Sequence, residues 1–260
     1  MTNSKLTAEI MIKAMAKEIK DGDVVLHGLA SPLPILAMSL AKSTHAPNSI
    51  FVGVSEGLDP DLGRIKLRLS SADPSIARGA IAFLELTDAF DLCQRKEVNV
   101  MFLGGAQIDK YGNINLSVIG EYARPKVRLP GGAATAFMTP ITPKIVIWAA
   151  RQSKRVFVEK VDFKTGVGYL EGDDSRERAG AWPITLKVIT NLAVYGFDEK
   201  TKLMKVESIH PEVTPEMIRE NTGFEIEIPS NVPTTEMPSE EELRLIQKWD
   251  PDNIRYSELT

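Results

Sequence analysis

The sequence predicts an α/β protein with an open, largely parallel sheet flanked by helices. Segments typical of helices and of strands alternate along the first half of the chain, which favours this class. The segments "VNVMFLGG" (98–105) and "KIVIWAA" (144–150) are almost continuously apolar, as strands covered on both faces are. A chain of 260 residues can bury a full core. We therefore expect one domain over 1–260, with a late hairpin and C-terminal helices (184–260) as an extension.

The first helix is expected to begin at Thr7, whose hydroxyl can cap its amino end. Its apolar positions repeat at helical spacing and predict a buried face: Ala8, Ile12, Met15 and Ile19. A strand over 24–26 follows, then a glycine turn and an apolar helix that runs to about residue 41. The next strand covers 50–54, and a further helix is expected over 81–92.

The second half is expected to be richer in strands. Besides 144–150, strands are predicted at 155–161 and in a hairpin of 184–197 with 203–209, which turns at residues 198–200. Two helices end the chain. One has Thr214 as its cap with Pro215 at its first position, and the other opens with the capping box that begins at Ser239.

Composition excludes several classes of function. The net charge of −4 and the pI near 5.6 give no electrostatic signal for nucleic acid or a membrane surface. Cys93 is the one cysteine, so a disulfide framework or a thiolate-rich metal site is not expected, and the three histidines have no metal-ligand spacing. The sequence has neither an apolar stretch long enough to span a membrane nor a signal-peptide pattern, so we expect a cytoplasmic protein.

In parallel α/β sheets, ligands bind beyond the carboxyl ends of the strands. Three segments of this sequence occupy such places. The first is Ser55-Glu56-Gly57, where an apolar strand ends in a carboxylate. The second is "GGAQIDKYGNIN" (104–115), which follows a buried strand. The third is "GGAA" (131–134), whose small residues would let backbone amides approach a ligand closely.

The order of these three segments resembles the beta subunit of family I coenzyme A transferases. The block 104–115 is similar to the glutaconate CoA-transferase branch, which carries a near-identical Gly-Gly-Ala-Gln-Ile/Val-Asp-x-Tyr-Gly-Asn-x-Asn. Segments at 155–172, 208–226 and 240–251 look most like the beta subunit of a steroid-ring-opening acyl-CoA hydrolase on the same fold. The resemblance therefore covers most of the chain.

The resemblance implies a mechanism and a partner. In the transferases a beta-subunit glutamate attacks the acyl-CoA thioester, so Glu56 would be the nucleophile, beside Ser55. Backbone amides of the glycine loops would bind the oxyanion and CoA: Gly104, Gly105, Ala106, Gly131, Gly132 and Ala133. We expect no permanently bound cofactor, a CoA thioester as substrate, and a hetero-oligomer with an alpha subunit.

The residues around Glu56 depart from the transferase pattern. The family places the glutamate two residues before the glycine, whereas Glu56 directly precedes Gly57 and Ser55 holds the family's catalytic position. In the related hydrolase the working carboxylate belongs to the alpha subunit, and in a decarboxylase relative a cysteine replaces the glutamate. An acyl-CoA hydrolase or C–C lyase is therefore the alternative function. A non-catalytic ligand-sensing module is a minor one.

Several other residues are candidates for the pocket. His27 follows a strand and precedes a glycine, so it either lines the pocket or is a buried histidine bonded to the backbone. Gln107 and Asn113 belong to the motif at 104–115. Within this motif, Asp109 and Asn113 are expected first to hold the turn through hydrogen bonds and only second to contact CoA or the partner. Arg124, Lys126 and Arg128 either meet the phosphates of CoA or form a solvated face. Replacement of Gly105 or Gly132 by valine is expected to reduce activity far more than stability.

Overall fold

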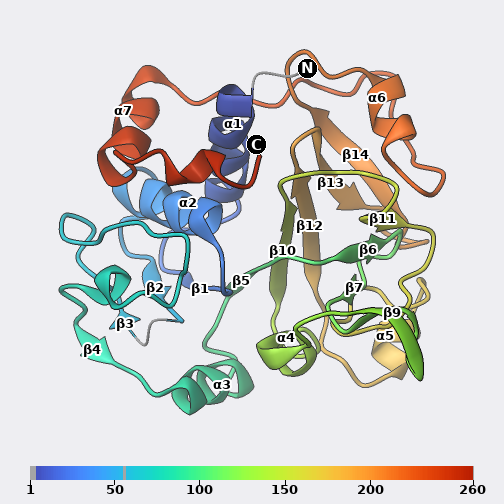
Figure 1. Ribbon diagram of the computed structural model, residues 1–260, viewed down its shortest axis with the longest axis horizontal. Coiled ribbons are helices and arrows are strands. Elements are labelled where there is room, and N and C mark those ends of the chain that lie inside the picture. Colours follow the sequence, from blue (N-terminus) through green and yellow to red (C-terminus); the bar gives the residue numbers. More distant parts are fainter. Residues whose placement is uncertain (1–3, 55–56, 260) are drawn as a thin grey trace. The chain divides into compact units, whose positions relative to one another are not determined.

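The computed structural model describes residues 4–54 and 57–259 (Figure 1). The chain divides into two compact units. Unit 1 falls within 1–102 and 235–260, and unit 2 comprises 103–234. Each unit combines a sheet with helices, and the α/β class is confirmed. The stretch 184–260, expected as one extension, is shared between the two units. No helix in the described ranges is long and apolar enough to cross a membrane.

The sheet of unit 1 is built around β1 (Val24–His27). This strand pairs in parallel with β2 (Ile50–Val52) on one side and with β5 (Val100–Leu103) on the other. Two short antiparallel strands, β3 (Gly57–Leu58) and β4 (Ala82–Phe83), continue the sheet beyond β2. The carboxyl ends of three parallel strands therefore meet at one edge of this unit.

Helices α1 (Ser4–Ala16) and α2 (Pro32–Ser43) pack against each other in unit 1. The predicted apolar face is confirmed for Ala8, Ile12 and Met15, which are buried in α1, whereas Ile19 is buried but lies beyond the end of the helix. The expected cap is wrong, since Thr7 lies inside the helix rather than at its start. The apolar repeat alone located this element.

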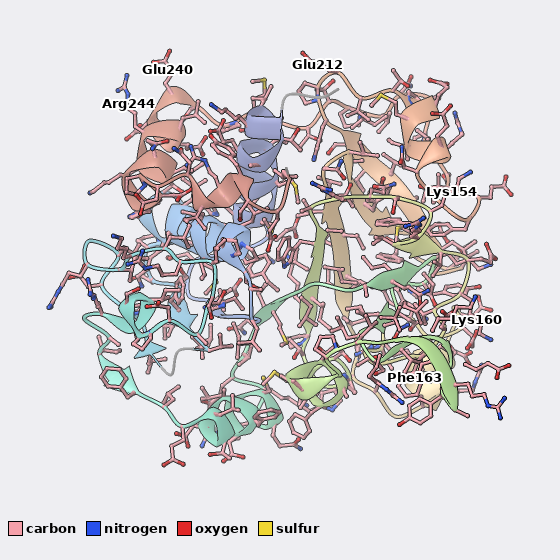
Figure 2. All side chains as sticks on the ribbon, in the orientation of Figure 1. Lys154, Lys160, Phe163, Glu212, Glu240 and Arg244 are labelled. Atoms are coloured by element: carbon pink, nitrogen blue, oxygen red, sulfur yellow. The ribbon has the colours of Figure 1, made fainter. Side chains whose placement is uncertain are left out.

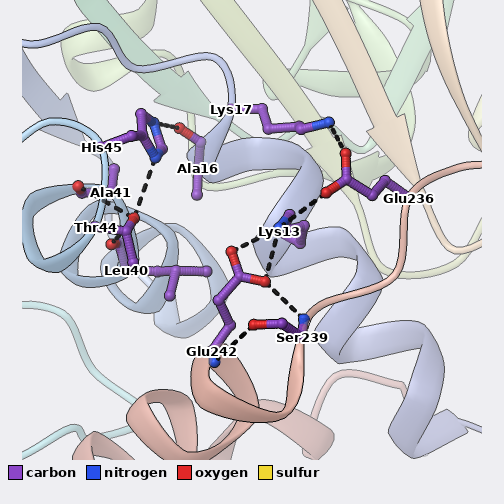
Figure 3. Close-up of polar contacts among 10 residues, drawn as sticks. All are labelled: Lys13, Ala16, Lys17, Leu40, Ala41, Thr44, His45, Glu236, Ser239 and Glu242. Carbon is purple, nitrogen blue, oxygen red and sulfur yellow. Dashed lines mark hydrogen bonds and ion pairs between the residues drawn. The ribbon is translucent and has the colours of Figure 1, made fainter.

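The C-terminal helix α7 (Glu240–Trp249) returns to pack on the amino-terminal helices of unit 1 (Figure 3). Lys13 of α1 lies 2.6 Å from Glu242 and 3.1 Å from Glu236, and Lys17 also pairs with Glu236. The predicted capping box is confirmed. The Ser239 hydroxyl accepts from the Glu242 amide, and the Glu242 carboxylate accepts from the Ser239 amide.

The helix expected over 81–92 begins later than predicted. Helix α3 spans Leu86–Gln94, and Phe83 lies in the edge strand β4. A capping box made by Glu85 and Asp88 sets the start of the helix. Ile81 and Phe83 are each 72% exposed, so they belong to no buried helical face. The remaining regular pieces of unit 1 are the short 3-10 turns Pro74–Ala77 and Ile254–Tyr256.

Four strands of unit 2 lie side by side in one sheet. Strand β10 (Lys144–Ala149) pairs in parallel with β12 (Thr185–Thr190), and β12 is followed by β13 (Ala193–Phe197) and β14 (Met204–Ile209) in antiparallel order. The predicted late hairpin is confirmed as β13 and β14, but its first arm, expected over 184–197, is divided into β12 and β13. Its turn contains Asp198, whose carboxylate accepts from two following amides.

Two smaller sheets complete unit 2. One holds β6 (Gln107–Asp109), β7 (Ile114–Asn115) and β11 (Phe157–Val158), so the strand expected over 155–161 is shorter than predicted. The other is a hairpin of β8 (Val118–Glu121) and β9 (Arg124–Arg128). The helices of this unit are short and are found in three places: α4 (Ala133–Met138), α5 (Ser175–Arg178) and α6 (Pro215–Glu220).

Candidate active site

The predicted nucleophile lies outside the described residues, as does Ser55 beside it. The residues that flank them belong to unit 1. Gly53 donates its amide hydrogen to the Gly57 carbonyl at 3.0 Å, and Val52 pairs with Leu58. These bonds join β2 and β3 on the two sides of the segment that carries the carboxylate.

His27 occupies the carboxyl end of β1, next to the end of β2. Leu26 is in register with Val52, and the His27 ring meets Phe51 edge-on with 5.6 Å between centroids. The side chain is fully buried, and its Nδ1 donates to the Gly28 carbonyl at 2.8 Å. Burial lowers the pKa of His27 to about 4, so the imidazole is neutral near pH 7. Its Nε2 is an acceptor with no partner among the described residues.

The motif at 104–115 forms a tight hydrogen-bonded turn in unit 2. The Asp109 carboxylate accepts from the amides of Tyr111 and Asn113 and from the Asn113 side chain. Asn113 also donates to the Leu170 carbonyl and accepts from the amides of Gly168 and Leu170. Burial raises the pKa of Asp109, and these donors oppose that rise. The expected turn-holding role of this pair is confirmed.

Gln107 is also held within the protein. Its carbonyl oxygen accepts from Asn115 and from the Asp162 amide, and its amide nitrogen donates to the Asp162 carboxylate. Gln107 and Asn113 are both buried and have protein partners at each polar end of their side chains. Their geometry supports a structural role, and their contact with a ligand stays a prediction.

The two glycine loops of unit 2 are neighbours, joined by residues 114–116. The Ala106 amide donates to the Asn115 carbonyl at 3.0 Å, and the Gly131 amide donates to the Leu116 carbonyl at 2.7 Å. Thr165 supports the same stretch, because its hydroxyl accepts from the Leu116 amide. The amides of Ala106 and Gly131 are therefore already hydrogen-bonded within the protein. The other amides of the two loops are the candidate oxyanion donors, and they are those of Gly104, Gly105, Gly132 and Ala133.

The second loop has a strained backbone. Gly131 has φ +99°, which glycine adopts at little cost, but Ala133 has φ +35°. An alanine in the left-handed region costs roughly 1–2 kcal/mol, and such conformations cluster at functional sites. Ala133 opens α4, where the first amides of a helix have no partner within the helix.

The glycines of the two loops are not equivalent. A Cβ on Gly105 would lie 2.6 Å from the Ile114 side chain, and one on Gly132 would lie 2.8 Å from the Thr165 side chain. The expectation that valine at these positions would spare stability is therefore wrong, because the protein's own side chains fill the space. Gly104 is different, since its nearest such neighbour is the Trp148 carbonyl at 3.9 Å.

Arg176 is a residue of this region that sequence reasoning missed. It is buried, and its guanidinium donates to four backbone carbonyls, which are those of Thr139, Val167, Gly168 and Trp182. Burial lowers the pKa of Arg176 to about 10. It ties the carboxyl end of α4 to the 167–168 segment. Its sequence context, "DDSRER", is typical of a solvated surface and gave no signal.

The site residues belong to different units. His27 and the segment that carries Glu56 are in unit 1, whereas the glycine loops, Gln107 and Asn113 are in unit 2. Among the described residues, no group of three or more His, Cys, Asp or Glu side chains is arranged to hold a metal ion. Each unit therefore contributes its own groups, which are a neutral imidazole in unit 1 and the backbone amides of two glycine loops in unit 2.

Comparison with known proteins identifies relatives of the whole chain. Residues 8–221 match the family described as coenzyme A transferase. The chain is 35% identical to the beta subunit of 3-oxoadipate CoA-transferase of Pseudomonas knackmussii, over 93% of this chain and 92% of that one. It is 32% identical to the beta subunit of glutaconate CoA-transferase of Acidaminococcus fermentans, over 92% and 90% of the two chains.

Proteins named for other reactions are also similar. The cholesterol ring-cleaving hydrolase IpdB subunit of Mycobacterium bovis is 28% identical over 97% of this chain and 98% of its own. The solved structure of the decarboxylase AibA/AibB aligns with a TM-score of 0.86 and 28% identity, over 97% of this chain and 98% of that one. The resemblance inferred from the motifs is thus confirmed at the level of the family, whose members differ in reaction.

Proposed function

This chain belongs to the coenzyme A transferase family, and from that premise we propose that it is the beta subunit of a two-subunit CoA-transferase. The enzyme would move CoA between an acyl-CoA and a carboxylic acid. The observation that carries the proposal is the 35% identity to a CoA-transferase beta subunit across 93% of the chain. The partner is an alpha subunit, and a CoA thioester is a substrate rather than a resident cofactor. The expected cytoplasmic location stays a prediction.

Glu56 is the proposed nucleophile. Its carboxylate attacks the thioester carbonyl, forms a mixed anhydride and releases CoA thiolate. The thiolate then attacks the glutamyl carbonyl, which gives a glutamyl-CoA thioester and frees the acyl group as its acid. The acceptor carboxylate reopens this thioester through a second anhydride, and the thiolate attacks the acceptor's acyl carbonyl to form the new acyl-CoA.

Backbone amides are the proposed stabilisers of the tetrahedral oxyanions. Gly104 and Gly105, together with Gly132 and Ala133, are the candidate donors. Support comes from the strained φ of Ala133 and from the hydrogen bonds that hold both loops against residues 114–116. A rigid loop needs little reorganisation when charge develops on the substrate oxygen.

Acyl-CoA hydrolysis or C–C cleavage is the second candidate. It is favoured by the spacing of Glu56 directly before Gly57, which departs from the transferase pattern, and by the similarity to a hydrolase subunit and a decarboxylase. In that case a carboxylate of the alpha subunit would do the chemistry. The minor alternative of a ligand-sensing module has no observation in its favour.

One experiment separates these functions. The chain is co-produced with an alpha subunit, which we expect the neighbouring gene to encode. The complex is assayed for exchange of CoA onto a free acid and for thioester hydrolysis. Hydroxylamine or borohydride is added with acyl-CoA to trap a glutamyl thioester. Exchange with a label on Glu56 supports the transferase. Hydrolysis or cleavage with no label on this chain supports the second candidate.

A further inference from the structure

The β8–β9 hairpin of unit 2 carries an unusual concentration of positive charge. Arg124, Lys126 and Arg128 alternate along the five residues of β9, and all three are exposed. None of the three forms an ion pair with another described residue. The chain as a whole has a net charge of −4, so the positive charge of this hairpin is opposite in sign to that of the whole chain.

The described acidic groups around the hairpin form no ion pair with its three cations. Glu121 is opposite Arg124 in the register of the two strands, but no ion pair joins their side chains. The Asp162 carboxylate accepts instead from the Gly120 amide at 2.8 Å and from Gln107. Lys164, which follows Asp162 closely in the sequence, is paired with Glu171. The cations of β9 therefore remain available to an anionic ligand.

An exposed aromatic pair lies beside these cations. The rings of Tyr122, in the hairpin turn, and Phe163 are stacked with 5.2 Å between centroids and an angle of 26°. The Arg128 guanidinium lies 5.2 Å from the centre of the Tyr122 ring. Tyr122 is 61% and Phe163 37% exposed. Figure 2 labels the Phe163 side chain, which lies next to β9. The bond from Gly120 to Asp162 fixes the segment that carries Phe163 against the hairpin.

The hairpin leads directly into the second glycine loop. After β9, the Leu129 amide donates to the Ser117 carbonyl, and the Gly131 amide donates to the Leu116 carbonyl. Gly131 follows Arg128 so closely in the chain that their Cα atoms are at most about 11 Å apart. A molecule whose thioester oxygen meets the glycine loop could extend a long arm toward the cations and the rings.

We propose that the β8–β9 hairpin, with Phe163, binds the 3′-phosphorylated ADP end of CoA. This inference rests on the proposed function, because it takes CoA as the ligand. Guanidinium groups bind phosphate through paired hydrogen bonds, and Lys126 adds a point charge. The Tyr122–Phe163 pair offers a π surface on which the adenine stacks. The pantetheine arm spans the distance back to the glycine loop.

Binding of adenosine 3′,5′-bisphosphate to the alpha–beta complex tests the proposal without any reaction. The double variant Arg124→Ala/Lys126→Ala is compared with Lys154→Ala/Arg155→Ala, which removes the same two side-chain types from exposed positions of the same unit. We expect the hairpin variant to bind at least tenfold more weakly by calorimetry, and the control to change less than twofold. Tyr122→Ala should also weaken binding several-fold, whereas Tyr122→Phe should retain it.

A second measurement uses a thioester of pantetheine that lacks the nucleotide. The hairpin double variant should raise KM for acyl-CoA and leave kcat/KM for the truncated thioester unchanged. Equal affinity of wild type and the hairpin variant for the bisphosphate would overturn the proposal, even in an active CoA-transferase. So would loss of the alpha subunit from the hairpin variant, since that marks a subunit contact. If the complex binds the bisphosphate through the hairpin but does not exchange CoA, the proposed transferase reaction is wrong and the proposed binding site stands.

Discussion

A carboxylate that attacks a thioester must be ionised and must reach the carbonyl carbon, and both requirements fall on Glu56. Glu56→Gln should abolish CoA exchange in the alpha–beta complex, because an amide is not a useful nucleophile. Glu56→Asp should lower exchange by at least a hundredfold, because a carboxylate withdrawn by one methylene misses the attacking geometry. The measurement is exchange of labelled CoA, with Ser55→Ala as the control that should lose much less. Activity of Glu56→Gln within a few-fold of wild type would remove the transferase mechanism.

Two buried histidines give the chain a predictable acid sensitivity. Burial lowers the pKa values of His27 and His210 to about 4, from an ordinary value of 6.5. Between these values the unfolded chain binds protons that the folded chain does not, so stability falls as pH drops below 6.5. Each histidine can contribute up to about 1.4 kcal/mol per pH unit across this window.

The check is urea unfolding at pH 7.5 and pH 5.5. His27→Gln should reduce the loss of unfolding free energy between these two pH values. The exposed His45 provides the matched control as His45→Gln. A loss of stability that stays the same in His27→Gln and His210→Gln would assign the acid sensitivity to carboxylates instead.

At the scale of elements, local signals located helices and strands well. The Ile12 and Met15 stripe, the Ser239 capping box and the apolar strands 100–103 and 144–149 each appear where the pattern placed them. The predicted start of α3 was wrong because the helix begins at a capping box whose first residue is Glu85, and glutamate is an uncommon capping residue. Local pattern cannot tell an exposed apolar residue such as Phe83 from a buried one, because burial depends on distant parts of the chain.

The glycine loops show where sequence reasoning about the site ended. The motifs identified both loops, but not that residues 114–116 bond to each of them. The sequence also made Gly104 and Gly105 look alike. They differ in the structure, because a Cβ at position 105 would collide with the Ile114 side chain, whereas a Cβ at position 104 would have no close contact.

That difference yields a matched pair of variants. Gly104→Ala should leave the melting temperature within a few degrees of wild type and reduce exchange activity at least tenfold, because its new methyl group would keep a substrate oxygen from the amide. Gly105→Ala should lower the unfolding free energy by roughly 1–3 kcal/mol through overpacking. Thermal melts and exchange assays on both variants are required. Full activity in Gly104→Ala would exclude this amide from the oxyanion site.

At the scale of the whole molecule, local sequence patterns do not show which distant segments of the chain pack together in unit 1. The C-terminal helix α7 returns across the sequence to place Glu242 beside Lys13. Such a contact depends on the complete fold, and nothing in the local sequence around either residue indicates that the two side chains meet. The stretch 184–260, expected as an extension, is divided at residue 235 between the two units.

Assembly gives the last prediction, because the proposed enzyme has two kinds of subunit. The isolated chain should fold, since its described units have their own buried cores. It should nevertheless show almost none of the exchange activity of the alpha–beta complex, because we propose an active site that needs both chains. Size-exclusion chromatography with light scattering, followed by assays with and without purified alpha subunit, measures this directly. An unrelated protein of the same size, added in place of the alpha subunit, serves as the control. Full turnover by the purified chain alone would show that its own residues suffice for catalysis, and the two-subunit proposal would then be wrong.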